Sequence, residues 1–164
     1  MVGRSERVQG HTGPLWRLRE RYQVPVVLVL NKMDRAGADK DGCLAELRRR
    51  LSDRCVDLSD PGCGEELALC SEELLEAVLE GRAPTREQLA RAIARRQLFP
   101  CFFGSALKLE GVAPLLEALQ DLTLPLPRQE EFGARIYKVT RDDSGARLSW
   151  MKITGGALGV KEEL

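Results

Sequence analysis

The sequence predicts an α/β fold followed by a short antiparallel β unit. Two short aliphatic stretches, residues 24–30 and 98–103, are typical of buried parallel strands, and helical patterns precede, separate and follow them. After the proline-rich residues 124–127 the pattern changes to alternating residues with tight turns. We therefore expect a parallel sheet with flanking helices in residues 1–127, and antiparallel strands in residues 128–164.

Composition excludes several classes of protein. Hydrophobic residues make up 43% of the chain, which is enough for a real core and argues against disorder. Basic and acidic residues number 25 each, so the net charge is zero and the bulk charge gives no nucleic-acid signature. The sequence has no apolar run long enough to span a membrane, and its first residues lack the apolar stretch of a signal peptide. We therefore expect a cytoplasmic chain without a membrane partner.

The first helix is expected to start at Thr12, whose side chain can cap it, with Pro14 in its first turn. Its predicted inward face has residues spaced three and four apart, namely Leu15, Leu18 and Tyr22. A short connection leads from this helix into the strand at residues 24–30. Helix, tight turn and buried strand in this order are typical of an α/β fold.

Residues 41–97 are expected to form a mostly helical insertion between the two strands. A helix at about residues 41–52 opens it, and the arginines at positions 48–50 lie on its outer face. We interpret this run as a solvated face and keep a nucleic-acid patch as the alternative. Proline and glycine predict an irregular excursion at residues 53–69. Two further helices are predicted, at residues 71–79 and from the capping box that begins at Thr85.

The second strand, residues 98–103, contains Pro100, which cannot donate a hydrogen bond to a neighbouring strand. We therefore expect this strand to lie at an edge of the sheet or to begin at the proline. Residues 104–107 form a loop at its carboxyl end. The last predicted helix, at about residues 112–122, buries Leu115, Leu116, Leu119 and Leu122.

Residues 132–140 and 148–153 alternate in character and are joined by a turn at residues 142–145, which predicts a β-hairpin. Two or three strands do not close a barrel. We therefore expect residues 128–164 to be the truncated start of a larger β domain.

The cysteines do not predict a metal site. Five occur at irregular gaps without a C-x-x-C pair, and His11 is the single histidine. A zinc site formed by Cys55, Cys63 and Cys70 is the alternative, but reduced and partly buried thiols are the favoured interpretation.

The polar residues after the first strand have the chemistry to recognise guanine. Parallel sheets bind ligands beyond the carboxyl ends of their strands, where Asn31, Lys32 and Asp34 lie. The Asp34 carboxylate can accept hydrogen bonds from the ring N–H and the exocyclic amine of guanine together. Lys32 can lay its methylene stem along the ring, and Asn31 can bond the base edge and brace neighbouring loops. A backbone N–H at Ser105 and Ala106 would donate to the guanine carbonyl.

The N-K-x-D spacing alone is weakly specific, but here it ends a predicted buried strand, with Ser-Ala at the end of the next. Four segments closely resemble elongation factor G-type translational GTPases, and among these the ribosomal-protection tetracycline-resistance proteins; the segments are residues 8–12, 31–39, 98–100 and 104–108. The resemblance implies a partial P-loop-type GTPase domain followed by the first strands of a β-barrel domain. It also implies binding of GTP or GDP with Mg²⁺ and action on the ribosome, and it adds Leu107 to the guanine-binding loop.

The 164 residues lack other groups of that family. No G-x-x-x-x-G-K-[ST] phosphate loop occurs, and the switch threonine that helps hold Mg²⁺ and the D-x-x-G segment with its catalytic histidine are missing. His11 is interpreted as an ordinary polar histidine near a helix start. Because phosphoryl transfer relies on the missing groups, we predict no catalytic residue and no GTP hydrolysis by this polypeptide. Its affinity for GDP should be on the order of millimolar or weaker.

Two further expectations concern partners. A non-catalytic module that contacts the ribosome or another protein is the alternative function. The strand at residues 24–30 would lack one neighbour, and an open apolar strand edge invites pairing with another chain. We therefore expect self-association through Val26–Leu30, or through the surface that the missing part of the family's domain would cover.

Overall fold

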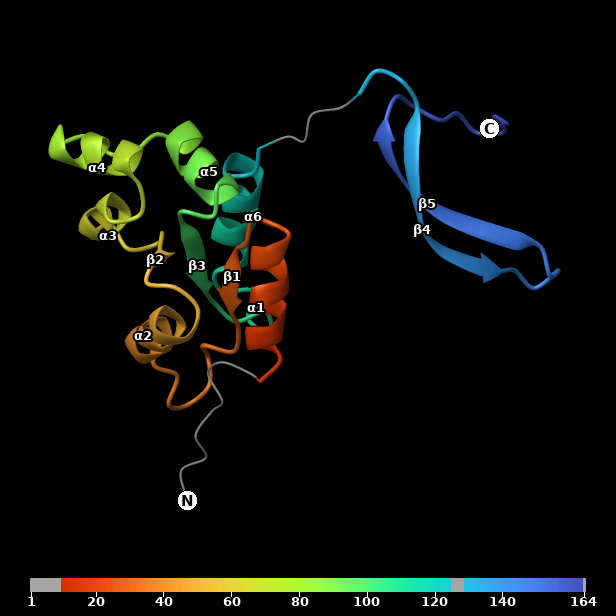
Figure 1. Ribbon diagram of the computed structural model, residues 1–164. Helices are drawn as coiled ribbons and strands as arrows, with labels where there is room; N and C mark the ends of the chain where they lie inside the picture. The colour runs from red at the N-terminus through yellow and green to blue at the C-terminus, as the bar shows by residue number, and fades with distance from the viewer. Residues whose placement is uncertain (1–9, 125–128, 164) are drawn as a thin grey trace. The chain divides into compact units, whose positions relative to one another are not determined.

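The computed structural model describes residues 10–124 and 129–163 (Figure 1). They fall into two compact units, of which the first ends at Leu124. The predicted linker after Leu124 and the first two residues of the 8–12 segment lie outside the described residues. No helix in the described part of the chain is long and apolar enough to cross a membrane.

The first unit contains a three-stranded parallel sheet in the order β1-β3-β2 (Figure 1). The strands are β1 (Leu28–Leu30), β2 (Cys55–Asp57) and β3 (Phe99–Phe103). Leu30 pairs with Phe103 and Asp57 pairs with Cys101, so the three carboxyl ends lie along one edge of the sheet. The predicted α/β fold with a parallel sheet is confirmed.

The prediction that the proline-containing strand lies at an edge is wrong, because β3 is the central strand. Backbone groups of a strand face its two neighbours alternately. The Phe99 N–H donates to the Arg54 carbonyl on the β2 side, and the Gly104 N–H donates to the Leu30 carbonyl on the β1 side. By this alternation the nitrogen of Pro100 faces the β1 side, before β1 begins. The proline therefore limits the length of β1 and leaves β3 in the centre.

The first strand is shorter and less buried than predicted. It was expected at residues 24–30, but only Leu28–Leu30 pair with β3. Val26 is buried, whereas Val29 is 53% exposed. Within the described residues β1 has one neighbouring strand, so its other backbone edge is open.

The segment between β1 and β3 contains a strand that the sequence did not reveal. Residues 53–69, expected to be irregular, contain β2 and the short helix α3 (Gly64–Ala68). Cys55 packs with Leu47 and Phe99, whereas the adjacent Val56 packs with Leu74 in a second cluster. Because β2 is buried on both faces and is only three residues long, it has no alternating pattern.

The predicted cap at Thr85 is confirmed, whereas the one at Thr12 is not. Ser71 caps α4 (Glu72–Leu79), and Thr85 forms the expected capping box with Gln88 in front of α5 (Arg86–Ala94). In α1 (Thr12–Arg21) the predicted Thr12 cap is wrong, because His11 occupies the cap position without a side-chain hydrogen bond. The remaining helices are α2 (Lys40–Arg50) and α6 (Val112–Asp121).

The predicted inward face of α1 is wrong, and that of α6 is only partly right. Leu15 and Leu18 are about half exposed, and Leu116 is 60% exposed. In α6, Leu115 is half-buried and Leu122 packs against the core cluster that contains Val56 and Leu74. Helix α1 contacts the sheet through Trp16, whose ring lies edge-on to Phe99 at 4.6 Å between centroids.

The arginine run on α2 is not a uniformly solvated face. The Arg48 Nε donates to the Cys55 carbonyl at 3.0 Å, and the guanidinium also forms an ion pair with Glu66 on α3. Arg50 forms an ion pair with Glu46 one helical turn earlier. Arg48 therefore ties α2 to β2 and α3, which the sequence pattern alone could not indicate.

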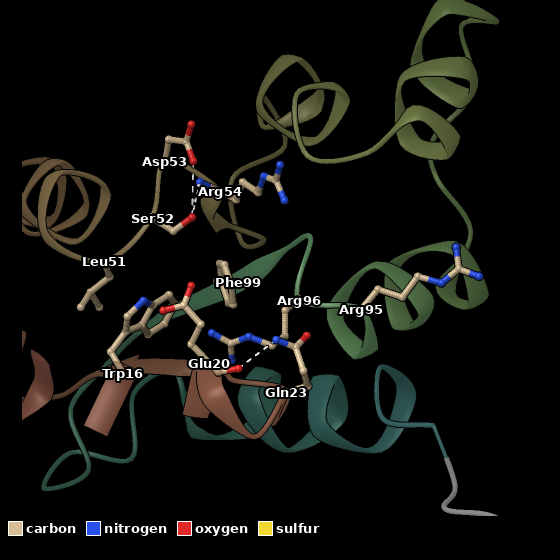
Figure 2. Close-up of a pocket in the computed structure, with 10 residues that line it drawn as sticks. All are labelled: Trp16, Glu20, Gln23, Leu51, Ser52, Asp53, Arg54, Arg95, Arg96 and Phe99. Atoms are coloured by element: carbon tan, nitrogen blue, oxygen red, sulfur yellow. Dashed lines mark hydrogen bonds between the residues drawn. The ribbon is translucent and has the colours of Figure 1, made fainter. Parts of the chain in front are cut away.

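Arg96 joins α1, β3 and the connection that leads into β1. Its guanidinium lies 5.2 Å from the Trp16 ring and 5.1 Å from the Phe99 ring, and its Nη1 donates to the Val24 carbonyl at 2.5 Å. Figure 2 shows the side chain pointing toward Trp16 and Glu20. The residue is only 9% exposed and has a φ of 57°, so these contacts hold it in a left-handed backbone conformation.

The second unit is a β-hairpin of β4 (Gly133–Arg141) and β5 (Arg147–Gly155). Its turn is closed by the Asp142 carboxylate, which accepts hydrogen bonds from the Ser144 hydroxyl and from two backbone N–H groups. The predicted antiparallel strands are confirmed. Apolar side chains on this hairpin remain substantially exposed, including Ile136, Tyr137, Leu148, Trp150 and Ile153.

The contacts of Arg96 predict that Arg96→Met lowers the free energy of unfolding by about 2 to 4 kcal/mol, because a charge-assisted hydrogen bond and two cation–π contacts are lost. Urea unfolding followed by tryptophan fluorescence measures this change. Arg95→Met is the matched control, since Arg95 is exposed and should tolerate the substitution within about 0.5 kcal/mol. Equal effects of the two substitutions would contradict the assigned role of Arg96.

Candidate functional site

Two cavities lie at opposite ends of the parallel sheet. The larger, about 310 Å³, lies at the amino ends of the strands near Trp16, Gln23 and Arg54 (Figure 2). The smaller, about 150 Å³, lies at the carboxyl ends of β1 and β3. Parallel sheets bind ligands beyond their carboxyl ends, so the smaller cavity is the candidate site. Its lining residues are Asn31, Lys32, Asp34, Arg35, Ser105 and Leu107.

Backbone hydrogen bonds bring the two loops of this cavity together. The Gly104 N–H donates to the Leu30 carbonyl at 3.0 Å, and the Met33 N–H donates to the Gly104 carbonyl at 3.1 Å. The first bond continues the pairing of β1 with β3 by one residue, and the second extends it into the loop after β1. The loops after the two strands are therefore adjacent because the strands are paired in parallel.

The Asn31 side chain joins the two loops. Its Oδ1 accepts the Lys32 N–H at 2.7 Å and the Ala106 N–H at 2.9 Å. With the oxygen used in this way, the amide nitrogen of Asn31 is the group that can donate to a ligand. The Ala106 N–H, expected to face a guanine carbonyl, already has an acceptor in Asn31, and Leu107 beside it is 88% exposed.

Lys32 lies in the left-handed region with a φ of 68°. This conformation costs a non-glycine residue about 1 to 2 kcal/mol. The neighbouring Asn31 oxygen accepts the Lys32 N–H and so helps to hold the turn. The exposed Lys32 side chain lines the cavity, where its stem is available to a flat ligand.

The carboxylate of Asp34 is held in its ionised form by its surroundings. The Ser105 hydroxyl hydrogen-bonds to it and holds the pKa of Asp34 below its usual range, and Lys108 and Arg35 act in the same direction. Ser105 is 1% exposed, and its hydroxyl also accepts the Lys108 N–H at 3.3 Å. An ionised carboxylate can accept two hydrogen bonds from one ligand edge.

Two glycines shape the loop that carries Ser105. Ser105 and Glu110 exchange backbone hydrogen bonds at 2.9 and 3.1 Å, which closes the loop. A Cβ atom at Gly104 would overlap the Glu110 carbonyl, and Gly111 has a φ of 75° that favours glycine. The sequence prediction missed both glycines, although glycine at a strand end is itself a signal for close backbone approach.

The described residues contain no group of three or more His, Cys, Asp or Glu side chains that could hold a metal ion. The three cysteines of the alternative zinc site do not converge: Cys55 is buried in β2, and burial raises the pKa of the Cys70 thiol to about 11. A Mg²⁺ ion would therefore need ligands other than a cluster of this kind.

A parallel α/β sheet that carries an N-K-x-D loop beside a Ser-Ala loop at its carboxyl edge defines a GTP-binding domain. The chain belongs to the elongation factor Tu GTP binding domain family, whose sequence profile matches residues 1–125. The predicted resemblance to translational GTPases is confirmed.

Relatives support this assignment along the whole chain. The tetracycline resistance protein TetM of Streptomyces lividans is 31% identical over all of this chain, and elongation factor G 1 of Geobacter sulfurreducens is 27% identical over 93% of it. The chain spans 30% and 33% of the length of these two relatives. A crystal structure of a Thermus thermophilus protein has the same fold, with a TM-score of 0.70 and 24% identity over 91% of this chain and 30% of that one.

The hydrogen bond from Ser105 predicts that Ser105→Ala raises the pKa of Asp34 toward its ordinary value, because the charged form loses a donor. Carbon-13 NMR titration of the carboxyl groups measures this shift. A site that needs ionised Asp34 would then lose its ligand at a higher pH as the solution is acidified. Ser144→Ala is the matched control, since the Ser144 hydroxyl lowers the pKa of Asp142 in the same way. A raised pKa of Asp142 in Ser144→Ala, together with an unchanged pKa of Asp34 in Ser105→Ala, would contradict the hydrogen bond assigned to Ser105.

Proposed function

We propose that the cavity at the carboxyl ends of β1 and β3 binds the guanine base of GTP or GDP. The Asp34 carboxylate accepts from the ring N–H and exocyclic amine, and the Asn31 amide nitrogen donates to the base edge. The Lys32 stem lies along the ring. The backbone N–H of Leu107 donates to the guanine carbonyl, since Asn31 accepts the Ala106 N–H, and the Ser105 hydroxyl holds Asp34 in place.

The observation that carries this proposal is the convergence of Asp34 and Asn31 on one cavity. Asp34 is kept ionised by the Ser105 hydroxyl, and Asn31 uses its oxygen internally, so one acceptor edge and one donor face the same space. Guanine offers two adjacent donors, whereas adenine offers no such edge to a carboxylate. The arrangement therefore supports selection of guanine.

We further propose that these 164 residues supply base recognition without GTP hydrolysis. The sequence has no phosphate loop, and base contacts alone leave the triphosphate and its Mg²⁺ to other groups. The relatives named as elongation factor G and as tetracycline resistance proteins support the ribosome as the partner of a protein that contains this site.

Base recognition without hydrolysis predicts that the unaltered polypeptide binds GDP with a dissociation constant on the order of millimolar and releases no phosphate from GTP.

Base recognition also predicts a change of nucleotide preference in the variant Asp34→Asn. In Asp34→Asn the ratio of GDP to xanthosine diphosphate binding should fall by about tenfold or more, because the new amide donates to the xanthine carbonyl and repels the guanine amine. Ligand-observed NMR with both nucleotides at equal concentration measures this ratio.

Asp142→Asn is the matched control for this experiment, because Asp142 lies in the hairpin turn of the second unit and does not line the cavity. An unchanged base preference in Asp34→Asn would contradict the assigned role of Asp34. Micromolar binding of GDP by the unaltered polypeptide would contradict the view that the base contacts act alone.

We also propose that the open edge of β1 mediates self-association of this polypeptide. Val29 is 53% exposed at the centre of the edge strand, and exposed Leu15 and Leu18 lie on α1. An apolar strand with free backbone groups pairs readily with a second strand.

The edge proposal predicts that Val29→Lys weakens self-association by about tenfold, because a charge on an edge strand disfavours pairing. Sedimentation velocity across a concentration series measures the change. Leu69→Lys is the matched control, since Leu69 is an 83% exposed leucine outside the sheet. A monomer at all concentrations, or equal effects of the two substitutions, would rule out pairing through β1.

A further inference from the structure

Asp57 is a buried carboxylate at the carboxyl end of β2. Its residue is 3% exposed, and its Oδ1 accepts the Ser59 N–H at 3.0 Å and the Ser59 hydroxyl at 2.5 Å. Burial raises the pKa of Asp57, but the ammonium group of Lys40 and the hydrogen bonds from Ser59 outweigh it and hold the pKa below its ordinary value. The carboxylate is therefore ionised, and its second oxygen depends on the ammonium group of Lys40.

Lys40 connects β2 and β3 at this edge of the sheet. Its ammonium group forms the ion pair with Asp57 of β2 and lies 5.3 Å from the centroid of the Phe103 ring, the last residue of β3. Lys40 is also the first residue of α2, directly after the Asp39 cap that ends the loop from β1. One side chain thus links the ends of β2 and β3 to the end of residues 31–39, the loop that carries Asp34 and is called the Asp34 loop below.

Both loops of the proposed guanine site, namely the Asp34 loop and the Ser105 loop (residues 104–110), adjoin residues that Lys40 contacts or follows. Phe103 precedes Gly104, whose carbonyl accepts the Met33 N–H. Asp39 precedes Lys40 and caps α2 by accepting the Gly42 N–H at 2.9 Å, which fixes the junction between the loop that carries Asp34 and α2. A displacement of the Lys40 ammonium would therefore act on the Ser105 loop through Phe103 and Gly104, and on the loop that carries Asp34 through Asp39.

We propose that Lys40 and Asp57 are positioning residues for guanine recognition, which set the separation of the Asp34 loop and the Ser105 loop without touching the nucleotide. The proposal rests on the function proposed above. Neither residue lines the cavity, so their effect on a ligand passes through the loops. The part of the chain that supplies Asp57 was expected to be irregular, and its contribution to the site follows from the position of β2 beside β3.

The Ala106 N–H reports the spacing of the loops without any nucleotide, because it donates to Asn31 across the gap. In Lys40→Met and in Asp57→Asn, we expect hydrogen exchange at Ala106 and Met33 to become about tenfold faster. Exchange at Leu67, in the helical insertion, should stay within about twofold of its rate in the unaltered polypeptide. Lys40→Arg should restore slow exchange, because it keeps the charge and the ring contact. Arg86→Met is the matched control, since it removes the ion pair of Arg86 with Asp121 between α5 and α6.

Nucleotide binding supplies the second measurement. Lys40→Met and Asp57→Asn should weaken GDP binding by about five- to tenfold while the preference for guanine over xanthine stays unchanged, because Asp34 itself is intact. Unchanged exchange at Ala106 in Lys40→Met would overturn the proposal, as would equal acceleration at Leu67, which indicates a general loss of stability. Faster exchange at Ala106 in a polypeptide that binds no guanine nucleotide would support the positioning role and overturn the proposed function instead. Lys40 is partly exposed, so Lys40→Met keeps the test valid if Asp57→Asn does not fold.

Discussion

The candidate site depends on the parallel pairing of β1 with β3. Leu30 lies opposite Phe103, and the Gly104 N–H continues the pairing beyond the strands. This register brings the Asn31 oxygen within 2.9 Å of an amide nitrogen that is 75 residues away in the sequence. Parallel strands require a long crossover connection, and the insertion of α2 to α5 supplies it while it also contributes the third strand.

The convergence of the candidate-site residues could be predicted from the sequence because they are concentrated in two short segments. Asn31, Lys32 and Asp34 follow one aliphatic stretch and Ser105 follows the next, so the rule for parallel sheets places them together. The way in which the groups are used could not be predicted. The Ala106 N–H is engaged by Asn31, and Asp34 depends on the Ser105 hydroxyl, since both relations arise only from the packing of the two loops.

The errors in the fold share a physical cause, which is that periodicity reports a face without reporting what covers it. Leu15 and Leu18 of α1 and Leu116 and Leu119 of α6 have helical spacing but remain exposed among the described residues. Conversely, β2 is buried on both faces and so shows no alternation at all. Pro100 was expected to place its strand at an edge or at its own start, yet β3 is central and begins at Phe99, because the side of Pro100 without an N–H faces a place where β1 has not begun.

The close contact between Gly104 and Gly111 has a consequence for how this site can diverge. The loop between them is closed by backbone bonds of Ser105 and Glu110, so its shape does not rely on the side chains at its tip. Ala106, Leu107 and Leu109 are exposed there, and Leu107 lines the cavity. Substitutions at the tip can therefore accumulate without displacing Ser105, which separates the evolution of the ligand-facing surface from the maintenance of the fold.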